Sequence, residues 1–179
     1  NKMRLRKGGK IPELNLPSIH GDTFNIESTY GKKTLVTFYR FATCPFCNLR
    51  ISEMNQRCAE LGENFNVVAI FDSPIDFLIE SMKKHDTSFI ILADENFKYF
   101  KTYDVEQSVW KFVVGSTTGF LRLCKAISKG YIPLIMKGSM STVPVDILLN
   151  EDGTIEKAYY GKSTADHLNF LEIKKFALK

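Results

Sequence analysis

The sequence lacks any long apolar run. No stretch of about 18 consecutive apolar residues occurs in the chain, which excludes a transmembrane helix. The first ten residues include the basic side chains of Lys2, Arg4, Arg6, Lys7 and Lys10 and no apolar segment of the length that a signal peptide needs. We therefore expect residues 1–10 to form a basic, disordered tail.

A strong excess of one charge is also missing. Charged residues make up 25% of the 179 residues and the formal net charge is only +4. No stretch gathers basic residues with interleaved aromatic ones, which is the pattern of many nucleic-acid-binding surfaces. The sequence therefore predicts no nucleic-acid partner.

Metal-ligating residues are few and dispersed. A structural zinc site needs about four ligands, usually from two Cys-x-x-Cys pairs. The chain has a single such pair, Cys44 and Cys47, and its three histidines, His20, His85 and His167, are scattered. We predict neither a bound metal nor a cofactor.

The cysteine pair follows a segment that is typical of a β-strand. Residues 34–39 are apolar and β-branched, which suits a pleated strand. Pro45 is disfavoured inside a helix but is accepted in its first turn, so Cys44 is predicted at a helix N-terminus. The unpaired N–H groups and the helix dipole there favour a thiolate, which is the reactive form of cysteine.

Cys47 lies one helical turn after Cys44, on the same face. A disulfide between them would close a very small ring and contribute little as a structural link. Reversible redox chemistry explains the pair better. Cys58 and Cys124 occur in helix-like apolar contexts and are predicted to be reduced, buried thiols. This cysteine usage indicates a cytoplasmic protein with a transient, catalytic disulfide.

The rest of the chain alternates strands and helices, which predicts an α/β fold with a partly parallel sheet. A loose hairpin around His20 to Asp22 is expected first, then a helix over 45–61 that Gly62 ends. The remaining expected elements are a strand at 66–71, a helix from Pro74 to about 85 capped by Asp72, a strand at 89–92, a hairpin over 145–149 and 154–160, and a last helix capped by Asp166. We expect one domain over residues 11–179.

Residues 105–136 interrupt this alternation with a broken apolar stripe. We predict one or two amphipathic helices inserted in the basic fold and covering the sheet. The alternatives are a lid, a dimer surface near the cysteines that would make the protein a homodimer, and a helix on a membrane surface.

The Cys-x-x-Cys pair at a strand-to-helix junction resembles the redox motif of thioredoxin-like proteins. Together with Pro144, which opens a strand, and with Ala158 to Lys162, it resembles the peroxiredoxin-like branch of the alkyl hydroperoxide reductase and thiol-specific antioxidant (AhpC/TSA) family over about residues 11–178. The resemblance implies a thioredoxin fold: a central mixed β-sheet flanked by helices, here with an N-terminal hairpin extension and a helical insertion. It also implies a redox-active Cys44 and a cis Val143–Pro144 bond that faces the cysteines.

The resemblance favours a thiol-dependent oxidoreductase. The first candidate is an antioxidant peroxidase, in which Cys44 attacks the peroxide and Cys47 forms the redox-active disulfide, with a thioredoxin- or glutaredoxin-like reductant. Typical members carry Pro-x-x-x-Thr-x-x-Cys, whereas Arg40 stands near the proline position here and Thr43 abuts Cys44. Two alternatives therefore stay open: a thiol-disulfide oxidoreductase acting on protein disulfides, and a redox-inactive binding module.

Four neighbours of the pair are predicted to support it. Arg40 could lower the thiol pKa or hold an anionic substrate, and Thr43 could cap the helix. Pro45 starts the helix and Phe46 forms an apolar rim. His167 could assist proton transfer, but its position at the start of the last helix favours a surface residue.

Overall fold

The computed structural model describes residues 2–105, 107, 119–131 and 142–179. Most of the predicted insertion at 105–136 therefore lies outside the described residues. No helix in the described ranges is long and apolar enough to cross a lipid bilayer.

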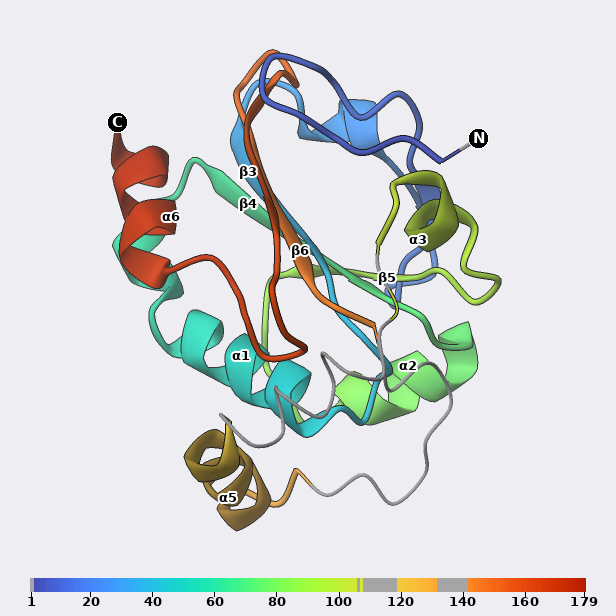
Figure 1. Cartoon of the computed structure of the whole chain (residues 1–179), viewed down its shortest axis with the longest axis vertical. Coiled ribbons are helices and arrows are strands. Elements are labelled where there is room, and N and C mark those ends of the chain that lie inside the picture. Colours follow the sequence, from blue (N-terminus) through green and yellow to red (C-terminus); the bar gives the residue numbers. More distant parts are fainter. Residues whose placement is uncertain (1, 106, 108–118, 132–141) are drawn as a thin grey trace.

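A mixed five-stranded sheet forms the centre of the molecule, in the order β5-β4-β3-β6-β7 (Figure 1). The strands are β3 (Lys33–Phe38), β4 (Phe65–Phe71), β5 (Ile90–Ala93), β6 (Val145–Leu149) and β7 (Ile155–Tyr160). β3, β4 and β5 are parallel, whereas β6 and β7 pair antiparallel. This is the thioredoxin-like arrangement expected from the sequence, and each predicted strand is found within one residue of its predicted bounds.

Alternation along the central strands divides the core into two layers, because successive strand residues face opposite sides of the sheet. In β4, Val67, Ala69 and Phe71 face one layer and Val68 and Ile70 the other. The first layer is covered by α1 (Pro45–Gln56), α2 (Ile75–Met82) and α6 (Phe170–Leu178), and the second by α3 (Lys98–Thr102) and the N-terminal segment. Strands covered on both faces explain the continuous apolar runs in the sequence.

The N-terminal hairpin consists of β1 (Asn15–Pro17) and β2 (Thr23–Asn25), followed by the short helix η1 (Ile26–Thr29). Leu16 pairs with Phe24 across the hairpin, which confirms the predicted turn around residues 20–22. Leu14 and Leu16 bury their side chains in the second core layer.

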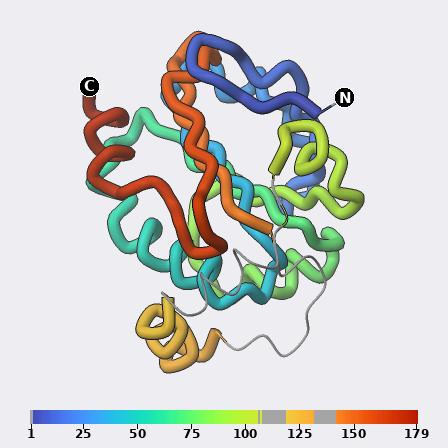
Figure 2. Tube along the Cα trace, in the orientation of Figure 1, coloured from blue at the N-terminus to red at the C-terminus, as the bar shows by residue number. Residues whose placement is uncertain are grey.

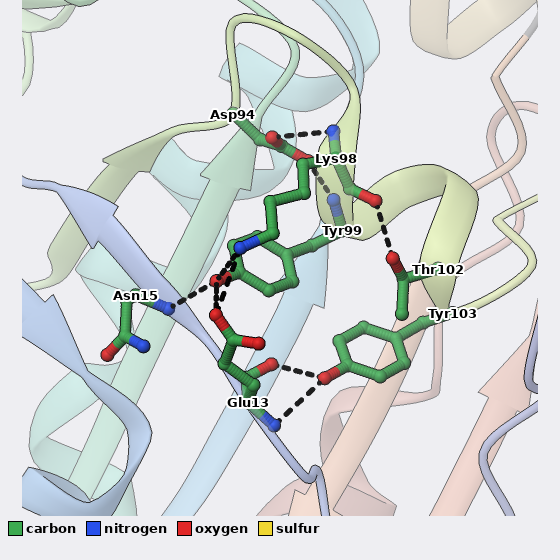
Figure 3. Close-up of polar contacts among 7 residues, drawn as sticks. All are labelled: Glu13, Asn15, Asp94, Lys98, Tyr99, Thr102 and Tyr103. Carbon is green, nitrogen blue, oxygen red and sulfur yellow. Dashed lines mark hydrogen bonds and ion pairs between the residues drawn. The ribbon is translucent and has the colours of Figure 1, made fainter. Parts of the chain in front are cut away.

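A polar network attaches this hairpin to α3 (Figure 3). The Tyr99 hydroxyl and the Lys98 ammonium both contact the Glu13 carboxylate at 2.9 Å. The Tyr103 hydroxyl donates to the Glu13 carbonyl oxygen, and the Asn15 amide donates to the Tyr99 hydroxyl at 3.1 Å. Tyr99 of the five-residue helix α3 and Tyr103, its C-cap residue, therefore fix the start of the hairpin.

Residues 2–10 pack against the domain instead of extending from it as a free tail. Leu5 is buried, and the Gly8 amide donates to the carbonyl of Ile155 at 2.8 Å. Lys10 forms a bridge with Thr154, so the segment runs along the turn between β6 and β7 (Figure 2). At this turn Gly153 has φ +82°, and a Cβ atom there would lie 2.3 Å from the Tyr30 ring, so only glycine fits.

Three predicted helix boundaries need correction. The helix at Pro45 ends at Gln56, and a separate short helix, η2 (Cys58–Leu61), completes the segment up to Gly62. α2 starts after Pro74 with no side-chain cap, so Asp72 does not cap it. Asn169, not Asp166, caps α6 through its bond to the Leu171 amide. Short polar side chains compete for caps, and Asp166 instead accepts from Tyr159 and from the Lys162 amide.

The Tyr160-Gly161-Lys162 segment has a structural role. The Tyr160 hydroxyl donates to the Tyr103 carbonyl at 2.7 Å and accepts from the Leu5 amide at 3.0 Å. A Cβ atom on Gly161 would lie 2.6 Å from the Asp166 carbonyl oxygen. This segment therefore fixes the backbone around Pro144, whose carbonyl accepts from the Gly161 amide at 2.9 Å.

Candidate active site

Cys44 is the N-cap residue of α1, and Pro45 occupies the first helical turn, as predicted. The sulfur of Cys44 accepts a hydrogen bond from the Cys47 amide at 3.3 Å. Helix N-termini present unpaired N–H groups and a partial positive charge. The N-cap position belongs to Cys44 itself, and Thr43 is the residue that precedes it.

The guanidinium of Arg40 lies directly against the Cys44 sulfur. Its Nε and Nη2 atoms are 3.2 Å and 3.1 Å from Sγ, so the planar guanidinium donates two hydrogen bonds to the sulfur. The arginine is only 2% exposed. Phe41 and Phe46 flank it, with ring centroids 5.4 Å and 5.8 Å from its Cζ atom. Phe46 is buried against Arg40 and does not form the exposed rim that the sequence predicted.

The two thiols are free and differ in acidity. Burial alone would raise the pKa of the Cys44 thiol, but the hydrogen bond from Cys47 and the charge of Arg40 lower it to about 6. Burial and the hydrogen bond to Cys44 raise the pKa of Cys47 well above its ordinary value. At neutral pH this arrangement holds a thiolate at Cys44 next to a thiol at Cys47.

The Asn48 side chain hydrogen-bonds the backbone of the loop that contains Cys44. Its side-chain amide donates to the carbonyls of Ala42 and Cys44 at 2.8 Å and 2.9 Å, and its oxygen contacts Nε2 of His85 at 2.8 Å. An amide oxygen can only accept, so Nε2 of His85 carries the proton. Burial and the nearby Lys84 lower the pKa of His85 to about 4, which keeps the ring neutral. Neither residue was expected at the site from the sequence. Asn48 lies four residues after Cys44 on one helix face, but no sequence signal links His85 to it.

Replacing Asn48 by alanine is expected to lower the free energy of unfolding by about 1–3 kcal/mol, because two buried carbonyls lose their donor. Urea unfolding of the reduced protein would measure the change. Asn55→Ala is the matched control, since Asn55 is on the same helix and makes one exposed bond to the Asp86 carbonyl. Equal losses in the two variants would show that Asn48 does not stabilise the loop.

A buried carboxylate lies behind the site. Asp146 accepts from the Thr37 hydroxyl at 2.8 Å, from the Leu168 amide at 2.6 Å and from Nδ1 of His167 at 3.2 Å. Burial would raise the pKa of Asp146, but His167 and Arg50 hold it below its ordinary value. The His167 side chain is only 6% exposed, so its predicted surface position is wrong. The Tyr39 ring packs against it at 5.3 Å.

Val143 and Pro144 precede β6 at the end of the sheet where β3 leads into the Cys44 loop, because Val145 at the start of β6 pairs with Phe38 at the end of β3. They line a pocket of about 270 Å³ with Arg4 and Tyr160. No peptide bond among the described residues is cis, so the predicted cis Val143–Pro144 bond is wrong. A trans bond is the commoner state for X–Pro. The structure thus brings Arg40, Cys44, Phe46 and Cys47 together, with Val143 and Pro144 in a neighbouring pocket.

The chain resembles known proteins in sequence and in fold. Over 110 residues, or 61% of this chain and 68% of the relative, the sequence is 24% identical to peroxiredoxin Bcp of Bacillus subtilis (strain 168). Among solved structures, peroxidoxin BcpB from Mycobacterium tuberculosis superposes with a TM-score of 0.71 at 12% identity, covering 98% of this chain and 97% of the other. Thiol peroxidase from Chromobacterium violaceum gives 0.68 at 16% identity, with 99% and 88% covered.

The structural likeness establishes the thioredoxin-like fold, and the sequence profile goes further. The profile of the AhpC/TSA family matches residues 8–158, which include β3, the Cys44 loop, α1 and most of β7. This match covers well over half of the chain, and the chain belongs to the AhpC/TSA family.

Proposed function

We propose that the protein is a thiol peroxidase in which Cys44 attacks the peroxide and Cys47 resolves the product. One observation carries this proposal: a buried guanidinium lies 3.1 Å and 3.2 Å from the Cys44 sulfur, at a helix N-terminus. This environment favours the thiolate, which is the nucleophile in peroxide reduction.

The reaction proceeds in two steps. The Cys44 thiolate attacks one peroxide oxygen and the O–O bond breaks, which leaves a sulfenic acid on Cys44 and releases the other oxygen as an alcohol or water after protonation. The Cys47 sulfur then attacks the sulfur of the sulfenic acid, the S–O bond breaks, and water leaves as the disulfide forms. An external dithiol of thioredoxin or glutaredoxin type returns both cysteines to thiols by two-electron reduction.

Arg40 has two functions in this mechanism. It stabilises the thiolate before the attack, and its N–H donors are positioned to bind the peroxide oxygens next to the sulfur. The strong donor that typical family members obtain from a threonine at their own spacing is supplied here by arginine. Cys47 keeps its proton until the sulfenic acid has formed, because its pKa is high.

Burial favours a small substrate over a protein disulfide. Cys44 is 0% exposed and Cys47 is 1% exposed. Exchange with a protein disulfide requires an accessible sulfur and in-line approach of a second chain, whereas hydrogen peroxide is little larger than water. Thiol-disulfide exchange remains the second candidate because the Cys-x-x-Cys pair suits it and the usual Pro-x-x-x-Thr-x-x-Cys spacing is absent.

Stopped-flow mixing of the reduced protein with hydrogen peroxide tests the proposal. We expect rapid loss of the Cys44 thiolate, followed by an intramolecular Cys44–Cys47 disulfide detected by mass spectrometry after digestion. Insulin reduction in the presence of a regenerating thiol system is the parallel assay. Insulin turnover without a reaction with peroxide would favour disulfide exchange, and no reaction in either assay would favour a redox-inactive module.

A further inference from the structure

A second concave site lies where α1, the 161–169 loop and the start of α6 meet. The pocket has a volume of about 410 Å³, and its lining residues include Arg50, Arg57 and Arg122 together with His167, Asn169 and Leu171. Arg50 lies on α1, and Arg57 is the C-cap residue of the same helix. Arg122 comes from α5 (Phe120–Ser128), which packs against α1 (Figure 1).

The three arginines are held in place by contacts with the protein. Arg50 donates to the Leu168 carbonyl at 2.7 Å. Arg57 stacks on the Phe170 ring at 3.7 Å. Arg122 bonds Glu53 at 3.2 Å through Nη2, while its Nε atom is buried and has no hydrogen-bond partner in the part of the chain that the structure describes. A ligand oxygen at this position would satisfy that donor.

The local charge is positive. Glu53 is shared between Arg122 and Lys125, and Glu60 is shared between Arg57 and Lys174. Arg50 adds a further cation. The other carboxylates of these segments are bound by groups of the protein: Asp146 by His167, Asp166 by the Tyr159 hydroxyl and the Lys162 amide, and Glu172, in the first turn of α6, by Lys157.

The N-terminus of α6 adds to this field. α6 is nine residues long and begins at Phe170, and its cap Asn169 also lines the pocket. The partial positive charge of a helix N-terminus favours bound anions. Three arginines and one helix N-terminus therefore bring positive charge to one concave pocket.

We propose that this pocket binds a small molecule that carries carboxylate or phosphate groups. Guanidinium forks match the planar or tetrahedral oxygens of both groups, and the volume is that of a small-molecule site. An extended nucleic acid is a poor fit, because the three arginines gather at one open pocket instead of following a surface stripe. The proposal does not rest on the peroxidase activity, since none of these arginines contacts the Cys44 sulfur.

Isothermal titration calorimetry of the reduced full chain with citrate and with inorganic phosphate tests the site, at constant ionic strength set with sodium chloride. We expect saturable binding of at least one of the two anions, and the comparison separates a carboxylate ligand from a phosphate ligand. Arg122→Gln is expected to weaken binding about tenfold or more, the effect of losing a charge-assisted hydrogen bond. Arg50→Gln should act in the same direction.

Lys125→Gln is the matched control. It removes one positive charge from the same helix and takes a partner from the same Glu53, but Lys125 does not line the pocket. The affinity of this variant for citrate or phosphate should therefore stay close to that of the unchanged protein. Thermal unfolding of each variant confirms that the fold is retained. Equal weakening in Arg122→Gln and Lys125→Gln, or no saturable binding of either anion up to about 10 mM, would overturn the proposal.

Discussion

Replacing Cys44 by serine is expected to reduce peroxide consumption to the uncatalysed background, a loss of more than about a thousandfold, because enzymes typically accelerate their reactions about a millionfold or more. A serine hydroxyl is not ionised at neutral pH and cannot form a sulfenic acid. The measurement is hydrogen peroxide consumption by the reduced protein with excess dithiol. Cys58→Ser is the matched control, since Cys58 is a half-exposed thiol at the start of η2 and is not part of the site.

The partner substitution separates the two steps. Cys47→Ser is expected to keep the first reaction with peroxide and to lose the intramolecular disulfide, so the Cys44 sulfenic acid should accumulate and be trapped by dimedone. The single-turnover rate should stay within a few-fold of the unchanged protein. If Cys44→Ser retained turnover, or if Cys47→Ser still formed an intramolecular disulfide, for example with Cys124, the assigned roles would be wrong.

The local part of the site could be predicted from the sequence. A β-branched run, a proline at the first helical turn and the three-residue spacing were sufficient to place Cys44 at the N-cap and Cys47 on the same face. These features depend on neighbours in the chain, whose steric and hydrogen-bonding preferences can be read directly. For the same reason the strands were predicted well, since their apolar runs report burial on both faces.

The parts that failed depend on contacts between distant segments. His167 appeared to be a surface residue because nothing in its neighbourhood indicates that Asp146, 21 positions earlier, lies buried beside it. The amide of Asn48 reaches His85 across 37 positions. Asp166 has a side chain suited to a helix cap, but its carboxylate accepts hydrogen bonds from the Tyr159 hydroxyl and the Lys162 amide instead. Such competition between partners is decided by tertiary packing.

The role of Arg40 was predicted from the sequence only in part. Replacing this residue gives the second large expected effect, on the pKa of Cys44. Its position four residues before Cys44 indicated an electrostatic role, while its burial and its two contacts with the sulfur appear only in the structure. With the arginine present the pKa of Cys44 is about 6, so at pH 7 most of Cys44 is thiolate. Without it the hydrogen bonds from Cys47 are left to oppose burial, and the pKa should rise toward its ordinary value.

Arg40→Gln is therefore expected to move the rising limb of the rate against pH to higher pH. Once the pKa exceeds 7, each further unit lowers the thiolate fraction at pH 7 about tenfold, so a rise all the way to the ordinary value of a cysteine thiol should slow the reaction with peroxide at pH 7 by about one to two orders of magnitude. Part of this loss should be recovered at high pH. Ultraviolet absorbance of the thiolate measures the pKa directly, and stopped-flow mixing with peroxide measures the rate.

Two further variants make this result specific. Arg40→Lys keeps the positive charge but loses the two-donor guanidinium. The pKa of Cys44 in this variant should therefore fall between its values in the unchanged protein and in Arg40→Gln. Arg4→Gln makes the same chemical change at an exposed arginine that lies over the Tyr160 ring, and its profile should not move. A profile for Arg40→Gln that stayed centred near pH 6 in a folded protein would mean that the helix N-terminus and Cys47 alone stabilise the thiolate. If Arg40→Gln slowed the reaction equally at all pH values, its function would instead be to bind the peroxide.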